Sequence, residues 1–172
     1  ASAVQDFAGR FRPRDYNPAW LLVGDRTSLY ALDMTAKDRP VVEQLGPGVH
    51  ILENNPLHAP SAKVDHVRDL LGDLGALEGT AIVDRMRSVL ADHSIPPVPA
   101  RLGSGAGAAG PGESGTRPVE SQAACVHTDA YGTRSSTLVG VPAAAGQRPR
   151  VLVADGHPCT APWADVTALF EP

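Results

Sequence analysis

The chain has 172 residues, with 15 basic and 19 acidic side chains and a formal net charge of −4. This length suits one domain with its own core, so we expect a single domain over residues 1–172. The lack of excess positive charge disfavours a nucleic-acid-binding protein, and no apolar run reaches the roughly 18 residues of a membrane span. Two cysteines are too few for a disulfide scaffold, which favours a reducing, cytoplasmic compartment. The excess of arginine over lysine and the abundant alanine are typical of a GC-rich bacterial genome.

The first third of the chain is predicted to form a short helix followed by strands. Residues 3–11 have an amphipathic pattern that Pro13 would end. Short apolar or alternating runs bounded by turn residues then predict strands. These runs are Trp20–Gly24, Ser28–Met34, Val41–Leu45 and Val49–Leu52.

Two helices are predicted in the middle of the chain. Ser61 is a suitable N-cap for a helix whose apolar residues, from Val64 to Leu74, recur at helical spacing. Gly72 and Gly75 would weaken and then end it. A second apolar stripe runs from Ile82 to Leu90 and is closed by two prolines.

The last third begins with a segment that has little to bury. Residues 101–120 are rich in glycine, with no following Lys-Ser/Thr to indicate a phosphate loop, and predict a flexible loop. Strands are then expected over Ala123–Thr128, Thr133–Val141 and Arg150–Ala154, and the tail after Pro158 fits either state. Strands, two helices and further strands indicate an α+β fold with antiparallel sheets, not a Rossmann sheet.

Three motifs in this frame resemble one protein family. They are Tyr16–Asp25 (YNPAWLLVGD), Leu45–Asn54 (LGPGVHILEN) running on to Pro60 and Lys63, and Tyr131–Thr137 (YGTRSST). In this order they resemble the NRDE superfamily, the transport and Golgi organisation family. The Asn-Arg-Asp-Glu motif that names the superfamily is absent, so the resemblance implies the C-terminal portion of such a protein, with a missing N-terminal half as a partner of the fold.

The family resemblance implies a fold and two functions. The fold would be part of an αββα sandwich like that of N-terminal-nucleophile hydrolases, with antiparallel sheets and two central helices. One implied function is a binding or trafficking protein for haem, a lipid or another small hydrophobic ligand. The alternative is an amide-bond hydrolase whose nucleophile lies in the missing half, because Ala1 lacks the side chain that such a nucleophile needs. Catalysis by this chain alone is the less favoured of the two.

Candidate site residues come from the second and third motifs. Asn54 could donate to a developing oxyanion as in related hydrolases, or it could form a turn with Asn55. Arg134 could hold a carboxylate or form an internal ion pair, and we expect it to be partly buried beside the Asn54 loop. Asn54, Asn55, Tyr131 and Arg134 are therefore the candidate binding residues, and Asn54 and Arg134 the candidate catalytic ones.

A metal site is a further alternative. Cys125 and His127, and again His157 and Cys159, stand two residues apart, which in a strand places both side chains on one face. Two thiolates and two imidazoles suit zinc, although zinc ligands usually have wider spacings. The competing interpretation is a buried Cys125 with exposed histidines. No haem motif is present, and an axial haem ligand could be any of His50, His58, His127 or Cys125.

Overall fold

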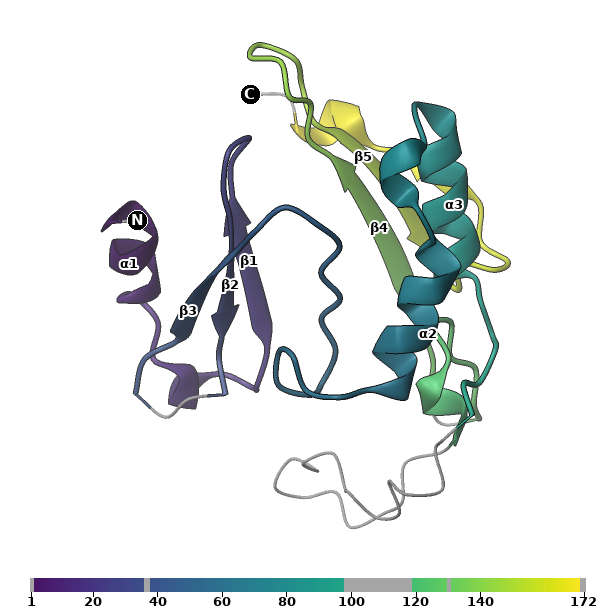
Figure 1. The fold of residues 1–172 in the computed structure, drawn as a ribbon, viewed down its shortest axis with the longest axis horizontal. Coiled ribbons are helices and arrows are strands. Elements are labelled where there is room, and N and C mark those ends of the chain that lie inside the picture. The colour runs from purple at the N-terminus through teal and green to yellow at the C-terminus, as the bar shows by residue number, and fades with distance from the viewer. Residues whose placement is uncertain (1, 36–37, 98–118, 130, 171–172) are drawn as a thin grey trace. The chain divides into compact units, whose positions relative to one another are not determined.

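The computed structural model describes residues 2–35, 38–97, 119–129 and 131–170 (Figure 1). The chain divides into two compact units, residues 1–54 and 55–172. Both combine helices with an antiparallel three-stranded sheet, which confirms the mixed helix-and-sheet class. The single domain over 1–172 stays a prediction. The flexible loop predicted over 101–120 lies outside the described residues, apart from its last two positions, which begin a 3-10 helix at Val119–Gln122.

The first unit is built on a meander of three short strands. β1 (Trp20–Gly24), β2 (Leu29–Asp33) and β3 (Val41–Leu45) pair antiparallel in chain order. The central strand β2 carries the core, because the side chains of Ala31 and Leu32 are almost fully buried. Alternate residues of a strand face opposite sides, so burial of these two neighbours means that both faces of β2 are covered.

Local contacts fix the ends of this meander. The helix α1 (Ser2–Ala8) precedes a 3-10 turn at Pro13–Asp15, and the rings of Phe7 and Phe11 meet edge to face at 4.9 Å. In the β1–β2 hairpin, one carboxylate oxygen of Asp25 accepts hydrogen bonds from the backbone N–H and hydroxyl groups of Thr27 and Ser28. These four bonds organise the turn and lower the pKa of Asp25 to about 2.

The second unit contains the two helices that the sequence predicts. The helix α2 (Ala62–Leu71) is capped by Ser61, whose hydroxyl accepts from the Val64 N–H at 3.3 Å. It ends earlier than expected, because Gly72 has a left-handed φ of 56°. A 3-10 turn at Leu74–Ala76 leads to α3 (Thr80–Leu90).

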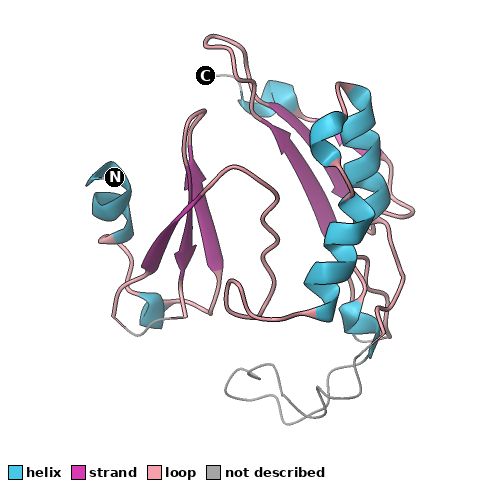
Figure 2. Cartoon of the chain, viewed as in Figure 1, coloured by secondary structure: helices cyan, strands magenta, loops and turns pink. Residues whose placement is uncertain are grey.

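Both helices lie against the second sheet (Figures 1 and 2). Its strands β4 (Ser135–Gly140), β5 (Arg150–Asp155) and β6 (Trp163–Asp165) pair antiparallel, with β5 in the centre, and a 3-10 turn at Thr167–Phe170 follows. The guanidinium of Arg87 on α3 lies over the Trp163 ring, 5.3 Å from its centroid. The tail that the sequence leaves undecided is thus a strand and a turn.

Two predicted strands are wrong. Residues 49–52 form no ladder, and the chain beyond them is held by the Trp20 Nε1 group, which donates to the Glu53 carbonyl at 2.9 Å. Residues 123–128 contain a single bridge, between His127 and Gly132. Both runs have strand-like composition but lack a neighbouring strand with which to pair. Among the described residues, no helix combines the length and apolar character of a membrane span.

Candidate metal centre and adjoining cleft

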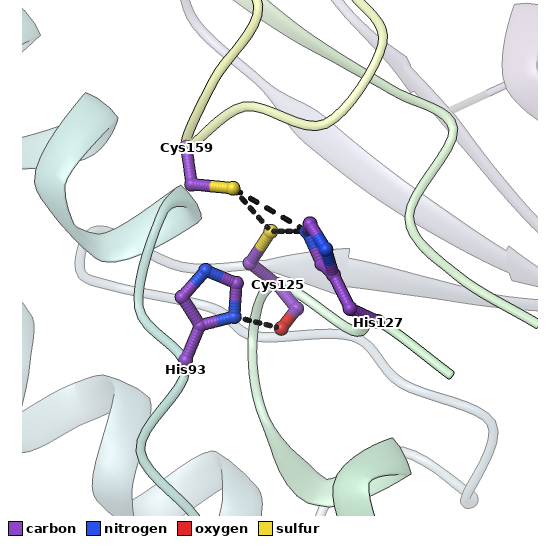
Figure 3. Close-up of side chains that lie close together, drawn as sticks. All are labelled: His93, Cys125, His127 and Cys159. Carbon is purple, nitrogen blue, oxygen red and sulfur yellow. Dashed lines mark hydrogen bonds between the residues drawn. The ribbon is translucent and has the colours of Figure 1, made fainter. Parts of the chain in front are cut away.

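Four metal-binding side chains from separate segments of the second unit converge on one point (Figure 3). His93 follows the end of α3, Cys125 and His127 follow the turn at Val119–Gln122, and Cys159 lies in the connection from β5 to β6. One potential ligand atom of each residue lies within 4.8 Å of those of the other three. Cys125 is buried, Cys159 is half-buried, and both histidines are exposed. We call these residues the four-residue cluster.

Backbone hydrogen bonds join the first two segments of the cluster. The Cys125 N–H donates to the Asp92 carbonyl at 2.8 Å. Because Asp92 directly precedes His93, this bond holds Cys125 beside His93. In return, His93 Nδ1 bonds to the Cys125 carbonyl at 3.0 Å. An Nδ1–H donated to a carbonyl leaves the other ring nitrogen, Nε2, with its lone pair free for a ligand.

Asp92 is itself held in place by its side chain. Its carboxylate accepts from His66 Nε2 at 3.1 Å and from the hydroxyl and backbone N–H of Ser94. Partial burial raises the pKa of Asp92, but these hydrogen bonds outweigh it and the pKa is lowered overall. The loop that carries His93 is therefore fixed to α2 as well as to Cys125.

The YGTR motif folds back beside His127. The Thr133 N–H donates to the Val126 carbonyl at 2.9 Å, and the Thr133 hydroxyl accepts from the Val126 N–H at 3.0 Å. A Cβ on Gly132 would stand 2.9 Å from that carbonyl and 3.2 Å from the His157 ring, so only glycine fits there.

A second turn brings Cys159 and His157 to the same place. The His157 carbonyl accepts from the N–H groups of Thr160 and Ala161, which closes the turn that carries Cys159. The His157 ring stacks on the His127 ring with centroids 3.8 Å apart. Its Nδ1 is buried and has no hydrogen-bond partner among the described residues.

The distances within the cluster suit coordination. The two sulfurs lie 3.7 Å apart, and His127 Nε2 lies 3.4 Å from Cys125 Sγ and 3.3 Å from Cys159 Sγ. Burial, with the nearby Cys159, raises the pKa of the Cys125 thiol to about 11. Desolvation and the neighbouring imidazoles of His157 and His93 lower the pKa of His127. Both shifts favour the neutral form, a thiol at Cys125 and an uncharged imidazole at His127.

The structure brings together three of the four residues that the sequence suggests as metal ligands. Cys125, His127 and Cys159 lie together, and the metal site itself stays a prediction. Of the competing interpretation, Cys125 is buried and His127 is exposed, whereas His157 is half-buried. The fourth position is taken by His93, whereas His157 stacks on the outside of His127. His93 stands 32 residues before Cys125 in a loop, and no local spacing in the sequence links the two.

An open cleft of about 560 Å³ adjoins the cluster. Its lining includes His127 and His157 together with the YGTR residues Tyr131, Gly132, Thr133 and Arg134. Tyr131 and Arg134, both candidate binding residues, therefore line one cavity. The prediction that Arg134 is partly buried is wrong: it is exposed, because it precedes β4, an edge strand, and borders this open cleft.

The other candidate residues lie where the two units join in sequence. Asn54 is the last residue of the first unit and is exposed, and Asn55 is the first residue of the second. Proximity of Asn54 to Arg134 therefore stays a prediction. Two of the suggested haem ligands, His50 and His58, do not belong to the cluster. The His50 ring bonds to the Gly46 carbonyl at 2.8 Å, and the His58 backbone has a positive φ of 67°.

Comparison with known proteins now places the chain in a family. The family model described as transport and Golgi organisation 2 matches residues 2–147. The chain belongs to this family. No curated protein and no solved structure matches it. The matched range contains all three motifs, the YGTR turn and the first three residues of the cluster, whereas His157 and Cys159 lie beyond it.

Proposed function

We propose that this chain is a ligand-binding member of a trafficking-related family and that its ligand is haem, bound in the cleft beside the YGTR turn. The observation that carries the proposal is the meeting of imidazoles and a cation in one open cavity, with His127, His157 and Arg134 in its lining. Membership in the transport and Golgi organisation 2 family supports the trafficking role.

The charge and chemistry of the cleft favour haem over a lipid tail. Within the described part of the chain, the Arg134 guanidinium has no carboxylate partner, so it is available to a haem propionate. Tyr131 is 65% exposed and offers an aromatic face to a flat ring. Hydroxyl groups of Thr128 and Thr133 and the two imidazoles make up much of the remaining lining, which suits an anionic ligand better than an alkyl chain.

We favour His157 as the residue that would hold the haem iron, because its ring lines the cleft. Imidazole is a common haem ligand.

Titration with hemin tests the proposal. We expect a saturable shift of the Soret band that ends at about one haem per chain. His157→Ala should change the spectrum of the complex, and Arg134→Ala should weaken binding without changing the spectrum. His50→Ala and Arg14→Ala, outside the cleft, are the matched controls. Adsorption that never saturates, or that an unrelated acidic protein reproduces, would contradict the proposal.

The hydrolase alternative remains a prediction. It requires the αββα sandwich, a nucleophile from a preceding half of the protein, and Asn54 and Arg134 close to one another. Its test is turnover of simple acyl amides by the purified 172-residue chain, for which we expect no activity. Turnover that disappears in an Asn54→Ala variant would favour the hydrolase over the binding protein.

A further inference from the structure

We propose that His93, Cys125, His127 and Cys159 are the four ligands of a structural Zn²⁺ site. This inference does not rest on the proposed haem function, since it needs neither Arg134 nor His157, although His127 belongs to the cluster and also lines the cleft. It rests on the kind of ligand atoms present, on their spacing, and on the way that their neighbours orient them.

The ligand atoms are those that zinc prefers. Two thiolates and two imidazoles form one of the common sets in structural zinc sites, and four protein ligands leave no open position for a substrate. Hard cations such as Mg²⁺ and Ca²⁺ prefer oxygen, and no carboxylate belongs to this cluster. The set therefore points to a closed, structural site and not to a catalytic one.

The spacing agrees with a tetrahedron around one ion. With Zn–S bonds of about 2.3 Å and Zn–N bonds of about 2.0–2.1 Å, tetrahedral geometry places two sulfurs about 3.8 Å apart and a sulfur and nitrogen about 3.6 Å apart. The sulfurs of Cys125 and Cys159 lie 3.7 Å apart, and His127 Nε2 lies 3.4 and 3.3 Å from them. For these three atoms, shifts of a few tenths of an ångström would reach tetrahedral spacing. The ligand atoms of all four residues lie within 4.8 Å of one another, so the His93 ring would move further inward to complete the site.

The surroundings orient the ligands as zinc sites require. The bond from His93 Nδ1 to the Cys125 carbonyl fixes the ring and leaves Nε2 as the ligand atom (Figure 3). The bond from the Cys125 N–H to the Asp92 carbonyl holds the same two segments together. Exposure of both histidines gives an ion a path from solvent.

The site would tie together three segments that the chain leaves far apart. Cys125 and Cys159 are 34 residues apart in sequence, and His93 is 32 residues from Cys125. An ion bound to all four would cross-link the end of α3, the segment before the YGTR turn and the connection from β5 to β6. Coordination releases the thiol protons to solvent, and its free energy adds to the stability of the second unit.

Metal analysis of the full chain tests this proposal. After treatment with a chelator and reloading with Zn²⁺ under reducing conditions, we expect about one tightly held zinc ion per chain. Loading with Co²⁺ should give the visible bands of a tetrahedral ion and a thiolate-to-cobalt charge-transfer band. Failure to retain zinc, or a cobalt spectrum without thiolate charge transfer, would overturn the proposal, whatever the outcome of the hemin titration.

Variants separate the four ligands from their neighbours. Cys159→Ser and His93→Gln should each lower zinc affinity at least about tenfold, as loss of one ligand does. His50→Gln is the matched control, because this histidine lies outside both the four-residue cluster and the cleft, and it should keep zinc. Cys125→Ser removes a buried ligand and carries the greatest risk to folding, so the decision rests on Cys159→Ser. Undiminished zinc in Cys159→Ser, or a Cys125–Cys159 disulfide in protein purified with its thiols protected, would also overturn the proposal.

Discussion

The two units contain similar three-stranded sheets but differ in the sequence distance between the segments that contact one another. In the first unit, successive strands β1, β2 and β3 pair through short connections, and the buried core lies on the central strand. In the second unit, the sheet is equally local, yet the four-residue cluster draws on three loops that lie more than thirty residues apart. Neighbouring segments stabilise a meander by strand pairing, whereas contacts between such distant loops also have to offset the entropy of closing long loops.

The core of the first unit gives the largest effect that we expect. Leu32 is fully buried at the centre of β2, so Leu32→Ala should lower the free energy of unfolding by about 2–5 kcal/mol through lost contacts and a residual cavity. Chemical denaturation measures the change. Leu22→Ala, on the neighbouring strand with its side chain 55% exposed, is the control and should cost far less. Equal losses for the two variants would contradict this account of the core.

Removal of metal should affect the second unit selectively. If zinc cross-links the loops, a chelator should speed hydrogen exchange at least about tenfold at the Cys125 and Thr133 amides, which bond to the Asp92 and Val126 carbonyls. Amides of β2 should exchange at an unchanged rate, because no residue of the cluster lies in the first unit. Hydrogen exchange with mass spectrometry compares the two regions in one sample. A uniform response of both units would contradict the local role of the ion.

The sequence predicts the local parts of both units well. The strands β1, β3 and β5 and the helix cap at Ser61 all follow from nearby residues, because turns, caps and periodic apolar runs act over a few positions. Residues 123–128 show why the rest fails. These residues are held in place by hydrogen bonds to the Asp92 carbonyl and to Thr133. Such contacts depend on the fold and cannot be predicted from the composition of the segment.

The candidate site is predictable to the same extent. The two short pairs of cysteine and histidine suggest a metal site in the sequence, and each pair contributes to the cluster. His93 could not be chosen, because five other histidines are available and only the fold places one beside Cys125. His157 was a reasonable fourth ligand by spacing, but the turn at Gly156 directs its ring onto His127 instead.

A smaller effect is expected from the pair that anchors the His93 loop. Asp92→Asn keeps the shape but loses the charge that accepts from His66 and Ser94, and it should cost about 0.5–1.5 kcal/mol at neutral pH. The folded-state pKa of Asp92 lies below its ordinary value of 3.8, so this contribution is present above that value and disappears as the pH falls through the lowered pKa. Denaturation at neutral and acidic pH measures the cost of the substitution and its dependence on pH. His66→Gln, which removes the ring that donates to Asp92, is the companion variant. A penalty that persists unchanged in acid would show that the charge is not its cause.

The smallest effect belongs to the β1–β2 turn, where the first unit has its own fixed carboxylate. Asp25 accepts four hydrogen bonds from Thr27 and Ser28, and its pKa is about 2 although the side chain is exposed. The unfolded chain binds a proton at Asp25 near pH 3.8, so the ionised form stabilises the hairpin above that pH, and the benefit is lost as the pH falls through about 2. Asp25→Ala should therefore lower the thermal midpoint slightly at pH 6, and the difference from the parent chain should shrink steadily as the pH falls from about 4 to about 2. Asp38→Ala, another exposed aspartate of the same unit, is the control and should show no such trend. Because the turn lies outside the cluster, the Asp25→Ala difference should be the same with and without a chelator, and a difference that depended on the chelator would contradict the local role of the ion.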